Sequence, residues 1–168
     1  MAQYRMVHVG LVLLLLLLFS GQSWGFSADV FLRAAAATGI PVELLLAISH
    51  VESRFHPHAI NISGESFFPS SESEALRLLL RSRNNVDIGL MQVNWGYWGD
   101  KFGLSKSELL DPQLNLLVGA KILEDCVRAS GSWWNGIALY HSPNGARQRE
   151  YTEKVWRSYQ RVLVKMRK

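Results

Sequence analysis

The chain has 168 residues, of which 48% are hydrophobic, and a formal net charge of +4 at pH 7. This length suits one domain. The apolar share is high enough to build a hydrophobic core, which excludes an intrinsically disordered chain. The charge would attract an anionic polymer or membrane surface, but a solvated basic surface accounts for it equally well, so no nucleic-acid partner is expected.

Residues 1–25 have the composition of a secretory signal peptide. Their apolar run, Leu11–Phe19, is nine residues long, whereas a helix needs roughly 20 residues to cross the hydrocarbon layer of a membrane. Ser23 and Gly25 are small residues at the positions minus three and minus one to a cleavage point. We therefore expect an exported, periplasmic protein whose folded domain comprises residues 26–168. An uncleaved leader that anchors the chain in the inner membrane is the alternative.

Two helices are predicted directly after the leader. The first is an Ala-rich segment, Ala28–Ala37, which ends at Thr38 and Gly39. The second runs from Pro41 to about Arg54, because proline suits the first position of a helix.

The middle of the chain is less regular. Asn61–Ser73 is rich in Ser, Gly and Pro and predicts a loop or a small hairpin. Glu74–Ser82 has a short helical pattern, and Asp87–Asn94 lacks helical amphipathicity.

The second half predicts four further helices from apolar spacing and from start and stop signals. They are Leu104–Leu110, Leu114–Ala129, a buried helix Trp133–Leu139, and Arg149–Lys168, with a turn over His141–Gly145. The total is six or seven helices with little strand, packed as one compact domain. This pattern predicts a mainly α fold with a small β part.

Cys126 is the only cysteine in the sequence, so no disulfide can form within the chain. It lies in the predicted helix Leu114–Ala129, four residues after Ile122, which predicts a buried small hydrophobic side chain. Pairing with another chain is the alternative.

Several histidine and tryptophan side chains could in principle bind metals or sugars. His50, His56 and His58 do not have the spacing of a zinc site, so neither a metal nor a cofactor is expected. Trp133 and Trp134 are expected to fill the core, because large aromatic side chains dominate core burial.

Glu52 has an unusual position for a glutamate. It falls on the apolar stripe of the predicted second helix, four residues after Ile48. A buried ion pair with Arg54 would make it a structural residue. Alternatively, apolar surroundings raise the pKa of a carboxyl group, which then holds a proton near neutral pH as a general acid must.

Three separated segments together resemble the lytic transglycosylase (SLT) family. They are Glu52-Ser53 at a helix end, Gly-Leu-Met-Gln-Val-Asn over residues 89–94, and Ala-Leu-Tyr over residues 138–140. Their order and spacing match over about Pro41–Tyr151, which is most of the domain. Within the family, the chain is most similar to the small exported members associated with type IV and type III secretion or conjugal transfer.

The resemblance implies a lysozyme-like α+β fold with a glycan-binding groove. It also implies cleavage of peptidoglycan between N-acetylmuramic acid and N-acetylglucosamine, with formation of a 1,6-anhydro ring. Glu52 would first protonate the glycosidic oxygen and then accept the proton of the sugar's own 6-hydroxyl. Glycosidases that use two carboxylates need a nucleophile or a base for water, and Asp87 is the acid that could provide one here.

The resemblance also implies supporting roles around Glu52. Ser53 would help to orient its carboxyl group, or else it is an ordinary serine at a helix end. Tyr140 would point its hydroxyl at the carboxyl group, or else it is a core aromatic residue whose hydroxyl bonds elsewhere. Gln92 would hydrogen-bond N-acetyl groups. The complete set of implied substrate-binding or supporting residues is Ser53, Gly89, Met91, Gln92, Asn94, Tyr140 and His141.

Two members of this set, Gly89 and Met91, have roles that follow from the type of residue. Gly89 would let the backbone approach the sugar, and Met91 is either a soft apolar surface for it or a core side chain. Trp95, Tyr97 and Trp98 follow the second motif directly and are candidates for stacking on sugar rings.

The sequence departs from the family pattern in two places. His141 stands where many relatives have Asn, which puts in doubt any contact made by that Asn. The segment Ile62–Ile88 is long, and its Phe67 and Phe68 are candidates for a flap over the groove or for a contact with a partner.

Two other functions fit the sequence. A goose-type lysozyme-like hydrolase shares the fold and the dominant glutamate but uses water in place of the 6-hydroxyl. A non-catalytic wall-binding subunit of a secretion machine is the other candidate, and it would need neither water nor the 6-hydroxyl as a reactant. The joint presence of Glu52, Gln92 and Tyr140 favours an enzyme.

Overall fold

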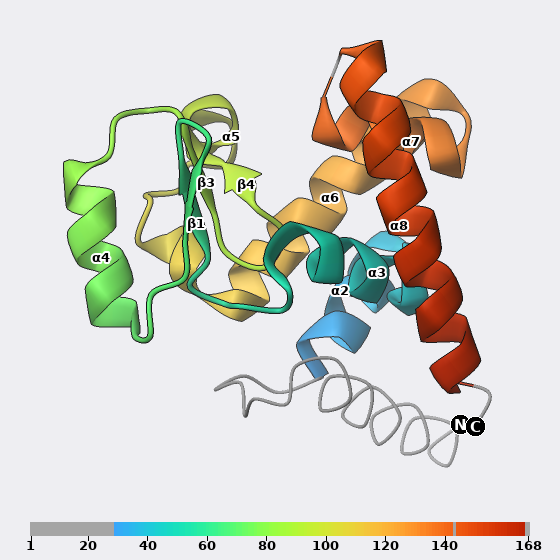
Figure 1. The fold of residues 1–168 in the computed structure, drawn as a ribbon, viewed down its shortest axis with the longest axis horizontal. Coiled ribbons are helices and arrows are strands. Elements are labelled where there is room, and N and C mark those ends of the chain that lie inside the picture. Colours follow the sequence, from blue (N-terminus) through green and yellow to red (C-terminus); the bar gives the residue numbers. More distant parts are fainter. Residues whose placement is uncertain (1–28, 143, 167–168) are drawn as a thin grey trace.

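The computed structural model describes residues 29–142 and 144–166, which form seven α-helices, one short 3-10 helix and four short strands (Figure 1). This composition confirms the predicted mainly α fold with a small β part. The predicted signal peptide, residues 1–25, lies outside the described residues.

Helices α2 (Asp29–Thr38) and α3 (Val42–Ser53) confirm the first two predicted helices. Eight of the twelve residues of α3 are buried. The helix ends because Arg54 adopts a left-handed conformation, with φ at 54°. The backbone N–H of Arg54 then donates to the carbonyl of His50, and that of Phe55 donates to the carbonyl of Ser49. Glu52 therefore lies in the last turn of a helix that is held firmly in the core.

The four strands form one antiparallel sheet with the order β2-β1-β3-β4. They are β1 (Ile60–Ile62), β2 (Glu65–Phe67), β3 (Val86–Ile88) and β4 (Val93–Asn94). Strands β1 and β2 are the hairpin predicted within Asn61–Ser73. Strands β3 and β4 place Asp87 directly opposite Asn94.

Two short elements differ from the prediction. Helix α5 (Trp95–Phe102) was not predicted, and the predicted helix Leu104–Leu110 is reduced to the 3-10 helix η1 (Glu108–Leu110). Helix α4 (Glu72–Arg81) confirms the short helix before the third strand, and Ser71 caps it by accepting a hydrogen bond from the backbone of Glu74.

The last three helices are α6 (Pro112–Ser130), α7 (Trp133–His141) and α8 (Gly145–Met166). Helix α8 begins four residues before the predicted start, so the predicted turn over His141–Gly145 is shorter than expected. The prediction that α7 is buried is wrong for one face, since Trp133 is 42% and Leu139 is 41% exposed. Trp133 therefore does not fill the core, whereas Trp134 packs against it.

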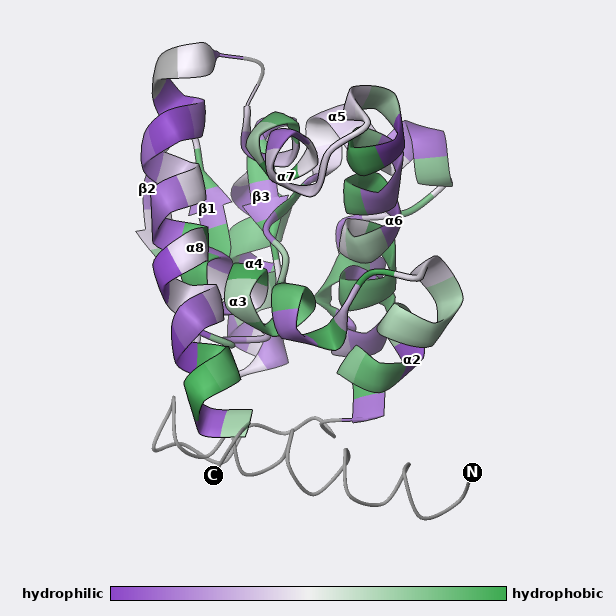
Figure 2. Ribbon diagram, turned by 90° about the vertical axis from the view of Figure 1, so that its right-hand side faces the viewer, coloured by the Kyte–Doolittle hydropathy of each residue, from purple (hydrophilic) through white to green (hydrophobic). Residues whose placement is uncertain are grey.

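Helix α6 runs between two parts of the molecule (Figure 1). The sheet, α4 and α5 lie on one side of it, and α2, α3, α7 and α8 lie on the other. Figure 2 shows α8 with mainly hydrophilic residues along its length, whereas α6 carries long hydrophobic stretches. This contrast agrees with α6 as a central helix and α8 as an outer one.

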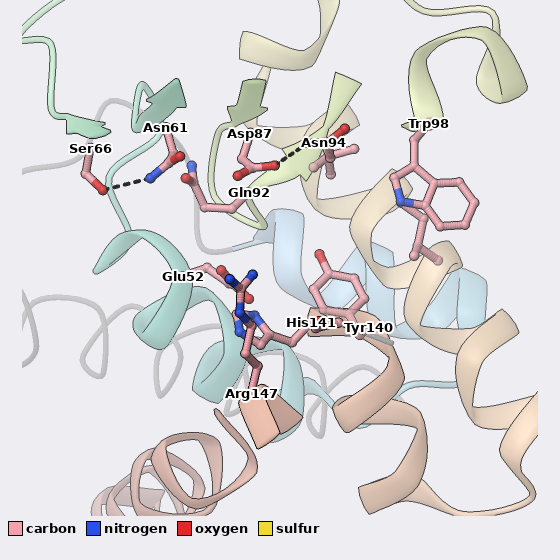
Figure 3. A pocket seen from close by; sticks show the side chains of 13 residues that line it. Glu52, Asn61, Ser66, Asp87, Gln92, Asn94, Trp98, Tyr140, His141 and Arg147 are labelled. Carbon is pink, nitrogen blue, oxygen red and sulfur yellow. Dashed lines mark hydrogen bonds between the residues drawn. The ribbon is translucent and has the colours of Figure 1, made fainter. Parts of the chain in front are cut away.

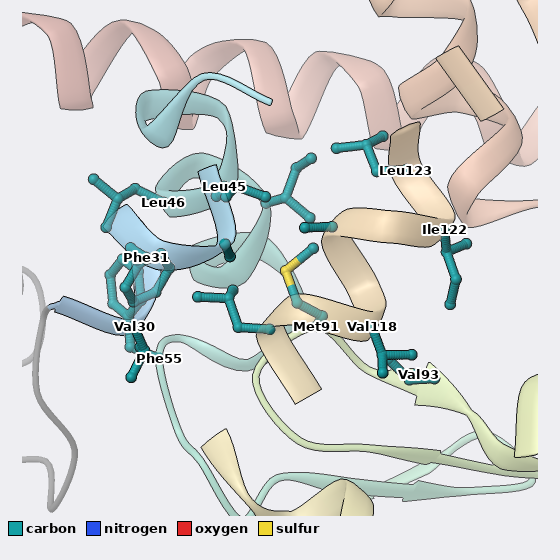
Figure 4. Packing of buried hydrophobic residues seen from close by; sticks show 14 of the residues in the cluster. Val30, Phe31, Leu45, Leu46, Phe55, Met91, Val93, Val118, Ile122 and Leu123 are labelled. Atoms are coloured by element: carbon teal, nitrogen blue, oxygen red, sulfur yellow. The ribbon is translucent and has the colours of Figure 1, made fainter. Parts of the chain in front are cut away.

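The core joins the two parts across α6 (Figure 4). Met91 lies at its centre and is fully buried, near Leu45 of α3 and Val118 of α6. Cys126 is partly buried and packs against this core, in agreement with its predicted apolar role.

No single helix in the described part of the chain is long and apolar enough to cross a membrane. Helices α2 and α3 pass the same test of length and composition only as a pair, and they are bent by 119° to one another.

Candidate active site

A cleft of about 360 Å³ opens beside Glu52 (Figure 3). One side is lined by polar residues of the sheet and the segment that follows it, and the other by residues from the end of α7 and the start of α8. Its polar lining residues are Glu52, Asn61, Ser66, Asp87, Gln92, Asn94, Tyr140, His141, Ser142 and Arg147. The cleft thus brings together the three motifs that were recognised in the sequence.

The carboxyl group of Glu52 has a pKa raised to about 7. Burial is the largest cause, because an apolar environment disfavours the charged form. A hydrogen bond from Tyr151 lowers the pKa, and the nearby negative charge of Asp87 raises it. At neutral pH the group is therefore divided between its acid and its base form, as a residue that both gives and takes a proton requires.

Tyr151 is a site residue that the sequence analysis missed. Its hydroxyl donates a hydrogen bond of 2.5 Å to Oε1 of Glu52, across 99 positions in the sequence. Burial raises the pKa of this hydroxyl well above its usual range, so it remains a donor at neutral pH. The sequence contained one signal, a tyrosine on the inner face of the last helix, because a buried tyrosine hydroxyl needs a partner.

The structure supports the second of the two roles predicted for the Tyr140 hydroxyl. In the first role it would point at the carboxyl group of Glu52, but it donates a 2.6 Å hydrogen bond to the backbone carbonyl of Met91. The Tyr140 ring lines the cleft, and the charge of Glu52 contributes to the raised pKa of its hydroxyl, after the larger effect of burial. The hydroxyl bonded to Glu52 is that of Tyr151 instead.

His141 has a clear place in the structure. Its ring stacks on that of Tyr151, with 4.1 Å between the ring centroids and 3° between the ring planes. His141 is the last residue of α7, and Tyr151 lies in the second turn of α8. The residue that departs from the family pattern thus covers one face of the tyrosine that contacts Glu52.

Met91 is a core residue and does not face the cleft. It is fully buried, and its sulfur accepts a hydrogen bond from the Ser49 hydroxyl at 3.1 Å. A Cβ atom at Gly119 would lie 2.4 Å from the Met91 side chain, so α6 needs a glycine there. Of the two roles considered for Met91, the structure supports core packing.

Gly89 approaches Asn115 and not the cleft, contrary to expectation. Its φ is +78°, and an added Cβ would lie 2.4 Å from Nδ2 of Asn115. The buried Asn115 side chain accepts from the backbone N–H of Met91 at 2.9 Å and donates to the carbonyls of Ile88 and Leu109 at 2.7 and 2.9 Å. Asn115 therefore fixes the segment between β3 and β4 to α6, a role that the sequence analysis missed although the residue interrupts an apolar helix face.

Ser53 connects the same segment to α3. Its hydroxyl lies 3.0 Å from the carbonyl of Ser49 and 2.9 Å from the carbonyl of Leu90. It has no hydrogen bond to Glu52 among the described residues. Ser53 thus supports the site by joining two elements, while Tyr151 contacts the carboxyl group.

Gln92 and Asn94 line the cleft as predicted. The amide nitrogen of Gln92 donates to the carbonyls of Ala59 and Gly89 at 3.1 and 3.0 Å, which uses both of its hydrogens. Its amide oxygen is then the atom available to a ligand. Asn94 caps α5 through its Oδ1 and donates from Nδ2 to Oδ1 of Asp87 at 2.8 Å.

Asp87 is a second carboxylic acid on the cleft. Burial raises its pKa, and the hydrogen bond from Asn94 lowers it. It faces the cleft from β3, on the side opposite α7 and α8 (Figure 3). The site therefore contains two acids of different surroundings, one on α3 and one on the sheet.

Only one of the three aromatic residues after the second motif, Trp98, lines the cleft. The indole N–H of Trp95 donates to the carbonyl of Leu104 at 2.9 Å, and the ring of Tyr97 lies 3.5 Å below the ammonium of Lys101. Phe67 and Phe68 are not part of the lining, although Ser66 beside them is.

The three histidines His50, His56 and His58 do not gather around one point. Nδ1 of His50 lies 3.1 Å from the Ser158 hydroxyl, and the rings of His56 and His58 are 6.2 Å apart. Over residues 29–142 and 144–166, no three His, Cys, Asp or Glu side chains are arranged to hold a metal ion.

The chain is similar to a known protein family and to several known proteins. The family model described as "Transglycosylase SLT domain" matches residues 29–162. Invasion protein IagB of Salmonella typhimurium is 28% identical over 163 residues, which cover 93% of this chain and 89% of that protein.

Two shorter matches are also informative. The type IV secretion system protein virB1 of Brucella suis is 38% identical over 104 residues, which are 59% of this chain and 43% of that protein. Protein virB1 of Agrobacterium fabrum is 35% identical over 98 residues, which are 55% and 39% of the two chains. No solved structure matches this chain.

Proposed function

Because the chain belongs to the transglycosylase SLT domain family, we propose that it is a peptidoglycan lytic transglycosylase with Glu52 as its catalytic acid and base. The bond cleaved is the one between N-acetylmuramic acid and N-acetylglucosamine, and the product carries a 1,6-anhydro ring. The observation that carries this proposal is the Glu52 carboxyl group, with a pKa of about 7, at the wall of a polar cleft.

One carboxyl group is sufficient for both halves of this reaction. Protonated Glu52 gives its proton to the glycosidic oxygen as the bond from that oxygen to the anomeric carbon breaks. The resulting carboxylate then accepts the proton of the muramyl 6-hydroxyl, while the O6 atom bonds to the anomeric carbon. No water is consumed, and Glu52 returns to its acid form.

Tyr151 assists the step in which Glu52 becomes negative. Its hydroxyl already donates to the carboxyl oxygen in the resting site, so it needs no rearrangement to stabilise the charge that develops there. Stacking of His141 on the Tyr151 ring holds that donor in place.

The glycan is held by the polar side of the cleft. The Gln92 amide oxygen is suited to accept from an N-acetyl N–H, and Asn94 is fixed beside it by Asp87. The Trp98 ring provides an apolar face for a sugar ring.

A hydrolase is the second candidate, and Asp87 is the observation that favours it. A carboxylate on the opposite wall of the cleft is suited to activate a water molecule, as in glycosidases that use two acids. The hydrogen bond from Asn94 stabilises the charged form that such a base requires.

We further propose that the enzyme acts outside the cytoplasm, with residues 1–25 as its signal peptide, and that it opens the wall locally for a secretion or conjugation apparatus. The similarity to a type IV secretion system protein and to an invasion protein supports this setting. N-terminal sequencing of the protein from the periplasmic fraction tests the first part, with a start near residue 26 expected.

The reaction is tested by digesting purified peptidoglycan with the protein and identifying the released sugars by mass spectrometry. We expect anhydro-muramic ends from the unchanged protein and a loss of about 100- to 10,000-fold in Glu52→Gln, the range that general acid–base catalysis contributes. Glu43→Gln, on the same helix but in its first turn, is the control and should retain activity.

The products separate the candidates. Reducing muramic ends that disappear in Asp87→Asn would identify a hydrolase with Asp87 as its base. Release of no sugar by the unchanged protein would exclude both enzymes and favour a wall-binding subunit.

A further inference from the structure

Two recesses meet at Glu52. The cleft of about 360 Å³ is the larger one, and a second recess of about 210 Å³ lies between the end of α3 and the start of α8. Glu52, His141 and Arg147, which Figure 3 shows at the larger cleft, line both, so the recesses share a wall at the acid. The smaller recess is completed by Val51, Glu150, Tyr151 and Lys154.

The smaller recess is lined by one strong cation, Arg147, that no acidic side chain pairs in the described part of the chain. Nζ of Lys154 lies 2.6 Å from Oε1 of Glu150, so these two charges cancel. Arg147 is exposed and forms no ion pair within the part of the chain that the structure describes. Burial lowers the pKa of His141, and the charge of Arg147 lowers it further, so the histidine adds little positive charge of its own near neutral pH.

Peptidoglycan is a branched polymer, and its branch differs in charge from its backbone. The two sugars carry neutral hydroxyl and N-acetyl groups, whereas every muramyl residue carries a lactyl group at O3 that ends in a carboxylate or continues into a peptide with carboxylates. A strand in the larger cleft with its scissile bond at Glu52 has such a branch next to the acid. The branch needs a second space there, and its charge needs a cation.

We propose that the smaller recess receives the lactyl or peptide branch of the muramyl residue at the cleavage point, and that Arg147 binds a carboxylate of this branch. This inference rests on the proposed function and adds a part of the substrate that the motifs do not address. A guanidinium group can donate two parallel hydrogen bonds to a carboxylate, which gives direction as well as attraction. Arg147 thereby distinguishes a muramyl from a glucosaminyl residue next to Glu52.

The test measures binding and not cleavage, so that it is independent of the reaction. The full chain carrying Glu52→Gln is titrated with three soluble oligosaccharides of equal length: one of N-acetylglucosamine only, one of alternating sugars with free lactyl groups, and one with peptide stems. Arg147→Gln is then added to the same chain. We expect this change to weaken binding of at least one of the two muramyl ligands about tenfold, the loss typical of one charge-assisted hydrogen bond.

Arg149→Gln is the matched control. Arg149 is an exposed arginine two residues further along α8, but it lines a different recess beside Trp134 and Trp156. Its removal lowers the net charge equally and should leave binding of all three ligands unchanged. Arg147→Lys should restore only part of the affinity, because lysine keeps the charge but not the paired donors.

The comparison among ligands decides the outcome. A loss with free lactyl groups alone identifies the lactyl carboxylate, and a loss with stems identifies a carboxylate of the peptide; either result supports the proposal. An equal loss with the N-acetylglucosamine oligomer, or no loss with any ligand, overturns it. Failure of the proposed function is seen separately, as absence of cleavage by the protein with Glu52 intact.

Discussion

The hydroxyl of Tyr151 is the group that connects the properties of Glu52 to the rest of the protein. It donates to the carboxyl group and so lowers a pKa that burial raises. In Tyr151→Phe we expect this pKa to rise above its present value of about 7 and kcat to fall about tenfold, since hydrogen bonds to charged groups contribute roughly 1.5–3 kcal/mol. The high-pH limb of the pH–rate profile should move to higher pH, because Glu52 must be protonated to act as an acid.

Tyr159→Phe is the control for this change. Tyr159 lies on the same helix, packs against the core near Trp134, and is not part of the cleft. Its pH–rate profile should match that of the unchanged protein. A Tyr151→Phe enzyme with lower kcat but the same profile would mean that the hydroxyl acts on packing and not on the charge of Glu52.

The raised pKa of Glu52 also has a cost in stability. The folded state holds the proton up to about pH 7, whereas an ordinary glutamate loses it near 4.5. Between these values the native state binds more protons than the unfolded state, so the free energy of unfolding falls as the pH rises. Glu52→Gln should therefore raise it by up to about 3 kcal/mol at pH 8 and by little at pH 4.

Urea unfolding at the two pH values measures this difference. Glu43→Gln, in the first turn of the same helix, is the control variant at both pH values. An equal effect of Glu52→Gln at both pH values would argue that packing, and not ionisation, accounts for the change.

At the scale of elements, the segment between β3 and β4 depends on α6. Asn115→Ala removes three hydrogen bonds from buried backbone groups and should lower the free energy of unfolding by about 3 kcal/mol. Gly89→Ala places a Cβ atom 2.4 Å from the Asn115 side chain at a φ of +78° and should lower it by about 2 kcal/mol.

The two changes should not be additive. In the double variant the Cβ of residue 89 enters the space that the Asn115 side chain has left, so the combined loss should be smaller than the sum by about 1 kcal/mol. A double-mutant cycle from urea unfolding measures this coupling. Strict additivity would show that the close approach of Gly89 and Asn115 is not a constraint on the fold.

Elements with clear end signals could be predicted from the sequence. Helix α6 has such signals in the sequence: Asp111 caps it, Pro112 stands at its start and Gly131 at its end. Helix α5 could not be predicted, because it contains two glycines and its start depends on a side chain, Asn94, that also binds Asp87 across the sheet. Such tertiary contacts override local preference.

The same division applies to the site. Glu52, Gln92, Asn94 and Tyr140 could be placed at one cleft from their motifs. The partner of each hydroxyl could not be predicted, because it depends on how α7 and α8 lie against α3. The hydroxyls of Tyr140 and Tyr151 were therefore distinguished only by the structure.

For the whole molecule, stability comes from packing without covalent cross-links. The sequence has one cysteine, Cys126, which is partly buried against the core. We expect the melting temperature to be the same with and without a thiol reductant, as measured by circular dichroism. A reductant-dependent value would indicate pairing of Cys126 with a second chain, which Cys126→Ser should abolish.

The contact between Glu52 and Tyr151 has a consequence for when the protein becomes active. It joins α3, the second described element, to α8, the last one, across 99 positions of the sequence. Before α8 docks, the carboxyl group of Glu52 lacks its hydrogen bond from Tyr151, and the cleft lacks the wall that Arg147 contributes. The complete site therefore forms only once the last described helix has packed against α3, so the proposed activity should appear late in folding.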